Sequence, residues 1–295
     1  LTAIVRGWHR DENGKFLEFS GRVTAFANKP YIQIEHQFIN TEEPSELALE
    51  RLSLKIKPKA CGDVQLALGQ GYYRTAIETS DDLVEMTLDD ETMLYQANEH
   101  FVDCFYGDFW ADWRDSCAGV AASIYQAHQN FPKRLKATPK GIVVDLYPSS
   151  APAARVLQGM AKTHRIQLYF HGSDTSLEEI STRSLQFQLA DRPALSREWF
   201  RDNNPWQETY FEEKLPKRLI TYFERMHDGR PLALGMMHFG DAPDAHYTDQ
   251  GRGHGETVWV NNEYDRPHWC SVLYGLIGER RMLDSALVTA RHWLD

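Results

Sequence analysis

The spacing of apolar residues changes once along this chain, near residue 174, and that change limits the fold more than any other feature. Before it, apolar and polar residues alternate as in a half-buried strand, most clearly from Tyr31 to Ile39. Ile4–Arg10 and Phe16–Phe26 flank a turn that contains the hairpin pair Asn13-Gly14. Further strands are expected at 47–56, 64–68, 93–97, 120–127, 142–147 and 165–171. Many strands joined by short polar turns predict an antiparallel β-sandwich over residues 1–172.

Beyond residue 172 the apolar spacing becomes helical. Ser173–Ser176 offers a helix cap, so we expect a short helix within a linker at 173–205. Trp206–His227 then has the spacing of a longer helix, with Pro216 placed to kink it. The rest of the chain, from 206 to 295, is therefore predicted to be a helical domain.

The end of the chain has the pattern of two helices joined by a short turn. Asp265 and Pro267 mark the start of the first helix, and Gly278 is placed to end it. A second amphipathic helix follows from Met282. Repeated hairpins of this kind build α/α toroids. We therefore predict a multidomain β + α protein, an antiparallel β-sandwich followed by a partial α/α toroid.

Composition limits the function classes. The formal net charge of −10 disfavours binding to nucleic acid or to an anionic membrane. Twelve per cent of the residues are aromatic, which suits a protein that stacks on sugar rings but also suits a large core. The four cysteines have no metal-ligand spacing; Cys104 and Cys117 are candidates for a disulfide, with free buried thiols as the preferred alternative. Both ends of the chain fall inside expected elements, so we expect a piece of a longer protein.

Polar side chains and glycines concentrate between His238 and Asp265. Five glycines from Gly235 to Gly255 permit irregular backbone beside these side chains. Asn261–Asp265 directly precedes a helix N-terminus, whose free N–H groups favour an anionic ligand. The segment is therefore the candidate functional site. The alternative is a hydrogen-bonded loop that joins two domains, with Asp265 acting only as a helix cap.

Histidines crowd the same segment. His238, His246, His254 and His268 are the candidates for a functional role, the last three of them for catalysis, whereas His227 and His292 are expected to be structural or solvated. A metal site built from His246, Asp249 and His254 is a weaker alternative because their spacing matches no zinc motif. We therefore expect no metal ligands and no cofactor, with a divalent cation such as calcium left open.

A second candidate lies in the sandwich, where residues 110–115 are dense in aromatic and charged side chains. Trp113 there is suited to stack on a sugar, and Arg114 to pair with a carboxylate. The alternative is a sheet edge that packs the tryptophans into the core.

Several short motifs resemble the exo-rhamnogalacturonan lyase-like family of polysaccharide lyases. They are Asn130-Phe131-Pro132-Lys133, Leu146-Tyr147-Pro148, Gly159-Met160-Ala161-Lys162-Thr163-His164, Leu168-Tyr169-Phe170-His171, Phe239-Gly240-Asp241, Trp259-Val260-Asn261-Asn262-Glu263-Tyr264-Asp265 and Ala290-Arg291-His292. The resemblance implies a central β-sandwich followed by an α/α toroid, with an N-terminal barrel and most of the toroid missing here. It also implies β-elimination at a 4-linked galacturonate of a pectic polysaccharide.

That reaction needs a group that neutralises the carboxylate, a base near C5 and an acid for the departing O4. On chemical grounds we assign Asn262 and Arg252 to the carboxylate. Tyr264 or His246 is the expected base, and His254 or His268 the expected acid. Further substrate contacts are expected from Asn261, Glu263, Trp259, Trp113 and Arg114.

Two other functions stay open. Asp249, Glu256, Glu263 and Asp265 supply enough carboxylates for a glycoside hydrolase, and a carbohydrate-binding protein without catalysis would use the same polar groups. In each case the expected partner is an acidic polysaccharide or oligosaccharide. The sequence does not indicate an oligomeric state. A secreted or periplasmic location is slightly favoured over a cytoplasmic one.

Overall fold

A computed structural model describes residues 1–12, 14–41, 46–71, 75–90, 107–190, 194–206, 216–228 and 233–295. They fall into two compact units that divide near residue 191, with Asp295 counted in the first. The strand expected at 93–97, Cys104 and residues 207–215 of the long helix expected at 206–227 lie outside the described residues.

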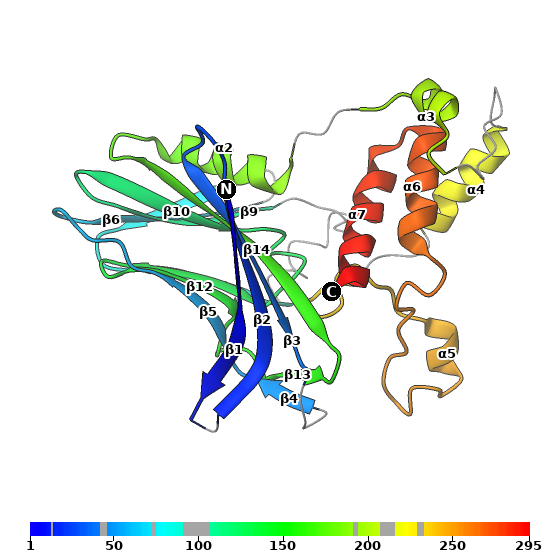
Figure 1. Ribbon diagram of the computed structural model, residues 1–295, viewed down its shortest axis with the longest axis horizontal. Coiled ribbons are helices and arrows are strands. Elements are labelled where there is room, and N and C mark those ends of the chain that lie inside the picture. Colours follow the sequence, from blue (N-terminus) through cyan, green and yellow to red (C-terminus); the bar gives the residue numbers. More distant parts are fainter. Residues whose placement is uncertain are drawn as a thin grey trace. The chain divides into compact units, whose positions relative to one another are not determined.

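The first unit is built on a sheet of eight antiparallel strands (Figure 1). Their order is β1-β2-β3-β14-β10-β9-β6-β7, so β1 and β7 form the two edges. The strands are β1 (Thr2–Asp11), β2 (Gly14–Ala25), β3 (Tyr31–Ile39), β14 (Ala161–Gly172), β10 (Ala118–Ile124), β9 (Asp108–Arg114), β6 (Gln65–Gly71) and β7 (Ala76–Ser80).

A smaller sheet covers part of the large one. Its strands, in order, are β5 (Leu52–Ile56), β12 (Gly141–Tyr147), β11 (Lys133–Thr138) and β8 (Val84–Leu88). They pack against β6, β9 and β10, which confirms the predicted β-sandwich. The single strand expected at 47–56 is instead two strands in different sheets, because the exposed pair Glu50-Arg51 interrupts it. The first of these, β4 (Glu46–Leu49), pairs with β13 (Ala154–Leu157).

Strand β9 is buried on both of its faces. Alternate residues of a strand point to opposite sides of the sheet. Phe109, Ala111 and Trp113 therefore face the sandwich core, where each is at most 3% exposed. Asp108, Trp110, Asp112 and Arg114 face the other side. The residues of this segment thus lie in two different environments, the sandwich core and the opposite face of the large sheet.

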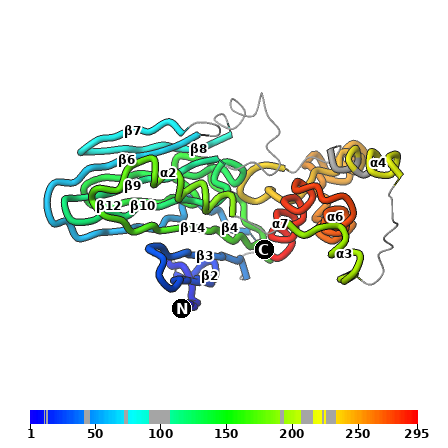
Figure 2. Tube along the Cα trace, turned by 90° about the horizontal axis from the view of Figure 1, so that it is seen from above, coloured from blue at the N-terminus to red at the C-terminus, as the bar shows by residue number. Residues whose placement is uncertain are grey.

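Helix α2 (Leu177–Gln188) lies on that other side and contacts β9, β10 and β14 (Figures 1 and 2). Ile180 of α2 packs with Trp110 of β9, and the indole N–H donates to Ser181 at 3.0 Å. Gly69 leaves room for this ring, since a Cβ there would lie 2.3 Å from the indole. The helix expected in the linker is therefore part of the sandwich unit.

The second unit contains α3 (Arg197–Asn203), α4 (Lys217–Asp228), α5 (Ala245–Asp249), α6 (Arg266–Ile277) and α7 (Arg280–Leu294). Helix α6 ends at Gly278, whose φ of 76° and N–H bond to the Tyr274 carbonyl match the predicted terminus. Asp265 occupies the cap position with φ 54° but makes no side-chain cap bond. Helices α6 and α7 pack together as the predicted hairpin; a toroid is not confirmed. Among the described residues, no helix is long and apolar enough to cross a membrane.

Candidate functional site

A buried carboxylate joins two strands on the α2 side of the large sheet. Asp112 of β9 is fully buried, and its Oδ2 accepts from Arg114 Nε at 2.6 Å. Its Oδ1 lies 2.7 Å from His171 Nε2 of β14. In the register of the three strands, Gly119 of β10 lies between Arg114 of β9 and His171 of β14. The imidazole fits there because glycine has no side chain; a Cβ on Gly119 would lie 2.2 Å from it. Charged groups this deeply buried are stable only when paired, as these are.

Both nitrogens of His171 face acceptors. Nε2 lies against Asp112, and Nδ1 lies 2.8 Å from the carbonyl oxygen of Gly172. A neutral imidazole carries only one N–H, so it can donate to only one of these two oxygens at a time.

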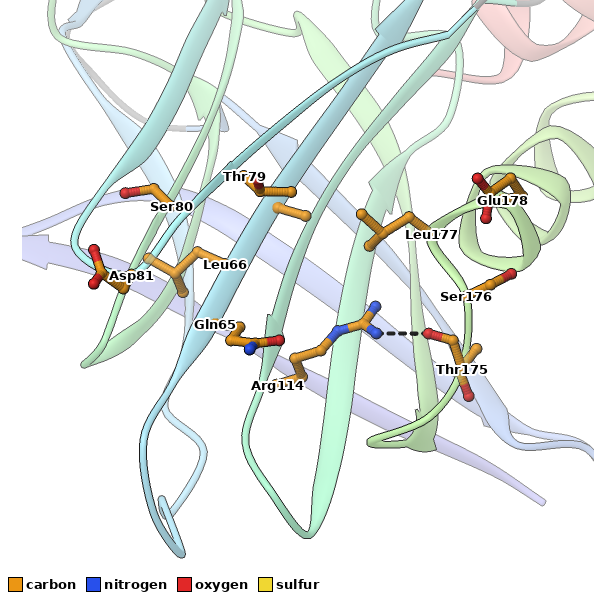
Figure 3. A pocket seen from close by; sticks show the side chains of 11 residues that line it. Gln65, Leu66, Thr79, Ser80, Asp81, Arg114, Thr175, Ser176, Leu177 and Glu178 are labelled. Carbon is orange, nitrogen blue, oxygen red and sulfur yellow. Dashed lines mark hydrogen bonds between the residues drawn. The ribbon is translucent and has the colours of Figure 1, made fainter.

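Arg114 connects this group to a pocket. Its Nη1 donates to the carbonyl oxygen of Thr175 at 2.6 Å, in the turn before α2 (Figure 3). Its Nη2 is buried and has no hydrogen-bond partner among the described residues. The side chain is only 11% exposed. An arginine nitrogen left without an acceptor in a buried place is costly, and a ligand oxygen would remove that cost.

The pocket, here called the sheet pocket, has a volume of about 630 Å³. Pockets of this size hold small molecules such as one or two sugar units. Most of the residues that line it are polar or charged, and they come from β6, β7, β9 and the start of α2 (Figure 3): Gln65, Leu66, Ala67, Thr79, Ser80, Asp81, Arg114, Thr175, Ser176, Leu177 and Glu178. Carboxylates, hydroxyls and an amide beside a buried cation offer both donors and acceptors to a ligand that carries hydroxyl groups.

The start of α2, which forms part of the pocket wall, is held by its own cap and by contacts with β14. Ser176 caps the helix by accepting from the Glu179 N–H at 3.1 Å. Beside it, Tyr169 donates to Glu179 Oε1 at 3.1 Å, and Arg183 lies over the Tyr169 ring at 5.7 Å. These contacts hold the first turn of α2 in place against β14.

Of the two sandwich residues expected to contact substrate, the structure places only Arg114 at a pocket. Trp113 is 3% exposed in the core, and its indole N–H donates to the Pro139 carbonyl oxygen at 3.2 Å. Its ring has no exposed face on which a sugar could stack. The odd and even positions of β9 explain the difference, because neighbouring residues of a strand point to opposite faces.

In the second unit, Asn262 is 1% exposed and fixes the loop that precedes α6. Its Nδ2 donates to the carbonyl oxygens of Gly240 at 3.1 Å and of Thr289 at 3.3 Å. Asn261 is exposed, and both asparagines have left-handed backbone, with φ of 49° and 52°. Asparagine tolerates this conformation better than most residues. Both N–H donors of the Asn262 amide are thus already used, one by Gly240 and one by Thr289 of α7.

Tyr247 brings two of the predicted residues together. The guanidinium of Arg252 lies 4.2 Å above its ring. Tyr264 is 62% exposed, and Glu263 with Tyr247 raises its pKa above the ordinary value. A phenol with a raised pKa stays protonated near neutral pH, which disfavours Tyr264 as the base.

Among the contacts of the described residues, His246 lies beside that group, with its ring centroid 5.9 Å from that of Tyr247, whereas His254 and His268 have no recorded contact with it. His246 Nε2 accepts from the Gln250 amide at 2.8 Å, and His268 Nδ1 lies 3.9 Å from Asp265 Oδ2. His254 is exposed, with a φ of 53°. Trp259 stacks on His238 at 4.1 Å between ring centroids. Within the described ranges, no group of three His, Cys, Asp or Glu residues is placed to hold a metal ion.

Sequence reasoning missed Asp112, His171 and the α2 side of the sheet pocket. The sequence could have indicated Asp112, because it lies two positions before Arg114 and therefore points to the same face of the strand. The remaining residues become neighbours only through the order of the strands, which no local spacing encodes.

No protein-family model matches the sequence, and no curated protein matches it. Solved structures resemble parts of it at low identity. A putative aldose 1-epimerase from Escherichia coli K12 is 8% identical over 58% of this chain and 65% of its own, with a TM-score of 0.29. The GalM/aldose epimerase homologue from C. elegans is 9% identical over 58% and 66%, with a TM-score of 0.32.

A larger protein shows a similar degree of likeness. The GH36 α-galactosidase AgaB from Geobacillus stearothermophilus is 12% identical over 77% of this chain and 35% of its own, with a TM-score of 0.40. This chain therefore spans less than two thirds of each of the three structures. None of the three is a rhamnogalacturonan lyase, and likenesses this remote do not assign the chain to a family.

Proposed function

We propose that this chain acts on an acidic carbohydrate and that the sheet pocket binds the carboxylate of one sugar unit. The observation that carries the proposal is the Arg114 guanidinium, which lines the pocket and whose Nη2 lacks a partner among the described residues; because Nη2 is buried, the ligand must displace the side chains that cover it. Hydrogen bonds between an arginine and a carboxylate are about twice as strong as those between neutral groups. A uronate is the type of sugar that supplies such an acceptor.

The other lining residues fit the rest of a sugar ring. Asp81 and Glu178 are exposed at the pocket and can accept hydrogen bonds from hydroxyl groups. Gln65 can donate and accept, and Leu177 offers an apolar surface to the C–H groups of the ring. The same two carboxylates would repel a second ligand carboxylate inside the pocket, so the other charged units of an oligosaccharide must lie outside it. The pocket therefore suits one carboxylate among neutral hydroxyls.

Titration calorimetry with galacturonate oligosaccharides and with the corresponding neutral galactose oligosaccharides tests the proposal. The acidic ligand should bind at least 10-fold more tightly, since one charge-assisted bond contributes about 1.5–3 kcal/mol. Arg114→Lys should remove most of that preference because lysine lacks the planar fork. Arg22→Lys, at an exposed arginine of β2 outside the pocket, is the matched control and should bind as wild type does.

Arg114 also pairs with Asp112, so its replacement risks the fold. Glu178→Gln provides a second variant, since Glu178 is exposed and lines the pocket without supporting the core. It should change the affinity for both ligands while the melting temperature stays unchanged. Equal binding of acidic and neutral ligands by the wild-type chain, or unchanged affinities in both pocket variants, would exclude the sheet pocket as the carboxylate site.

β-Elimination is the reaction that the sequence motifs imply, and it is proposed here for the loop before α6. Tyr264 and Arg252 both lie near Tyr247, so a protonated phenol and a guanidinium are available in one part of the loop region. Rhamnogalacturonan should give a product with the ultraviolet absorbance of an unsaturated uronate, and Tyr264→Phe should slow its release. New reducing ends without that absorbance would instead support a glycoside hydrolase.

A further inference from the structure

Two cysteines that are distant in the sequence lie at the same end of the large sheet. Strands β6 and β9 are antiparallel neighbours, and their register pairs Gln65 with Arg114. Cys61 lies in the loop just before β6, and Cys117 lies in the turn just after β9. The strand pairing therefore brings the two loops together, although 56 positions, from 61 to 117, separate the cysteines.

One carboxylate holds both loops. Asp115 Oδ2 accepts from the backbone N–H of Cys61 at 2.7 Å, and Oδ1 accepts from the backbone N–H of Cys117 at 2.8 Å. A third N–H, that of Ala118, donates to Oδ1 at 3.0 Å. These bonds, that from Cys61 above all, hold the pKa of the Asp115 carboxyl below its ordinary value. The carboxylate thus stays charged and keeps the two backbones side by side.

The next positions along both loops are also in contact. A Cβ on Gly62 would lie 3.1 Å from the Ser116 hydroxyl oxygen. Cys61 and Cys117 are both exposed. The neighbouring Cys117 side chain, followed by Asp115, raises the pKa of the Cys61 thiol. The two sulfur atoms are therefore near each other and accessible to a soluble reagent.

We propose that Cys61 and Cys117 form a reversible dithiol–disulfide pair that reacts with small-molecule disulfides such as glutathione disulfide. One cysteine thiolate attacks the reagent, which forms a mixed disulfide and releases one glutathione thiolate. The second cysteine thiolate then attacks the protein sulfur of the mixed disulfide and releases the other. Two protein thiols lose two electrons, one reagent disulfide gains them, and the two protons pass to the released glutathione.

The bond would fix the end of the sheet beside the sheet pocket, whose lining includes Gln65 and Arg114. It would also close a long loop of the unfolded chain, which stabilises a folded protein. We expect the oxidised form to melt roughly 5–10 °C above the reduced form. Because the raised pKa leaves Cys61 mostly as a thiol near neutral pH, the exchange should become faster as the pH rises.

The test equilibrates the whole chain with glutathione disulfide or with dithiothreitol, alkylates the remaining thiols and maps the peptides by mass spectrometry. Oxidation should protect Cys61 and Cys117 together and should yield one linked peptide that contains both. C61S and C117S should each abolish the link and the melting shift, whereas C104S, the matched control, should retain both.

Two results would overturn the proposal. One is a linked peptide that joins Cys117 to Cys104, the pair that the sequence suggested. The other is full alkylation of Cys61 and Cys117 after equilibration with glutathione disulfide at pH 8.5, a mildly alkaline condition that favours exchange. Neither readout depends on the ligand of the sheet pocket, so the two proposals fail separately.

Discussion

Side chains of the same type have very different surroundings in this chain, and those surroundings decide what each residue can do. Arg114 is buried with one nitrogen facing no acceptor among the described residues, whereas Arg252 lies exposed over a tyrosine ring. Asn261 is exposed, whereas Asn262 uses its amide to hold two carbonyl groups. The sequence places these residues correctly in a polar segment. It does not separate those that bind a ligand from those that hold the loop.

The neighbouring asparagines provide a direct comparison. Asn262→Ala leaves the carbonyl oxygens of Gly240 and Thr289 without their amide donor, and should lower the free energy of unfolding by about 1–3 kcal/mol. Asn261→Ala, at an exposed position with the same left-handed backbone, should cost less. Urea denaturation of both variants measures the difference. An equal effect of the two changes would show that the Asn262 amide does not hold the loop.

Buried histidines make the stability dependent on pH. Burial, with a smaller effect of His9, lowers the pKa of His36 from 6.5 to about 4. The unfolded chain therefore gains a proton at this residue as the pH falls below 6.5, while the folded chain does not until about pH 4. Stability should fall by about 3 kcal/mol over that range, since one pKa unit corresponds to about 1.4 kcal/mol.

The free energy of unfolding, measured from pH 7.5 to pH 4.5, tests the role of His36. His36→Phe keeps the stacking with Phe19, whose ring lies 5.8 Å away, and should flatten the pH profile. The exposed His268 is the matched control, and His268→Phe should leave the slope unchanged. Burial also lowers the pKa of His128, to about 3, so His128 contributes to the pH dependence as well and part of the slope remains in every variant. An unaltered profile in His36→Phe would contradict the assignment.

At the scale of elements, α2 shows how far local signals reach. The Ser176 cap and the helical spacing after it were enough to predict the helix, and the structure confirms both. Its docking on β9 was not predictable, because Trp110, Ala121 and Tyr169 come from three strands that only the sheet order brings together. The split of the strand expected at 47–56 was missed for the same reason, since the two halves join different sheets.

Docking of α2 should depend on its buried face. Ile180 is 1% exposed between the helix and the sheet, and Ile180→Ala should lower the free energy of unfolding by about 2–4 kcal/mol. Leu185, on the same helix but 37% exposed, is the control, and its replacement by alanine should cost less than about 1 kcal/mol. Guanidinium denaturation measures both changes. Equal losses would mean that α2 is not held by this face.

For the molecule as a whole, hydrophobic spacing was sufficient to predict a β-sandwich followed by a helical region. Alternation in strands such as β3 and the signals that bound α6 are local, so one sequence carries them. The sheet pocket is not local, because its lining comes from three strands and the start of a helix. Of the lining residues, only Arg114 was predicted as a substrate contact, and that prediction came from the chemistry of its side chain and not from its position in the fold. The toroid and the β-elimination reaction stay predictions.

The central claim is that Arg114 binds the carboxylate of an acidic sugar in the sheet pocket. A crystal structure of the chain with a galacturonate oligosaccharide measures this directly. We predict a carboxylate oxygen within hydrogen-bond distance, about 2.7–3.0 Å, of Arg114 Nη2, with hydroxyl groups near Glu178 and Asp81. A ligand bound instead at the loop around Asn262 and Tyr264, with the sheet pocket empty, would contradict the claim.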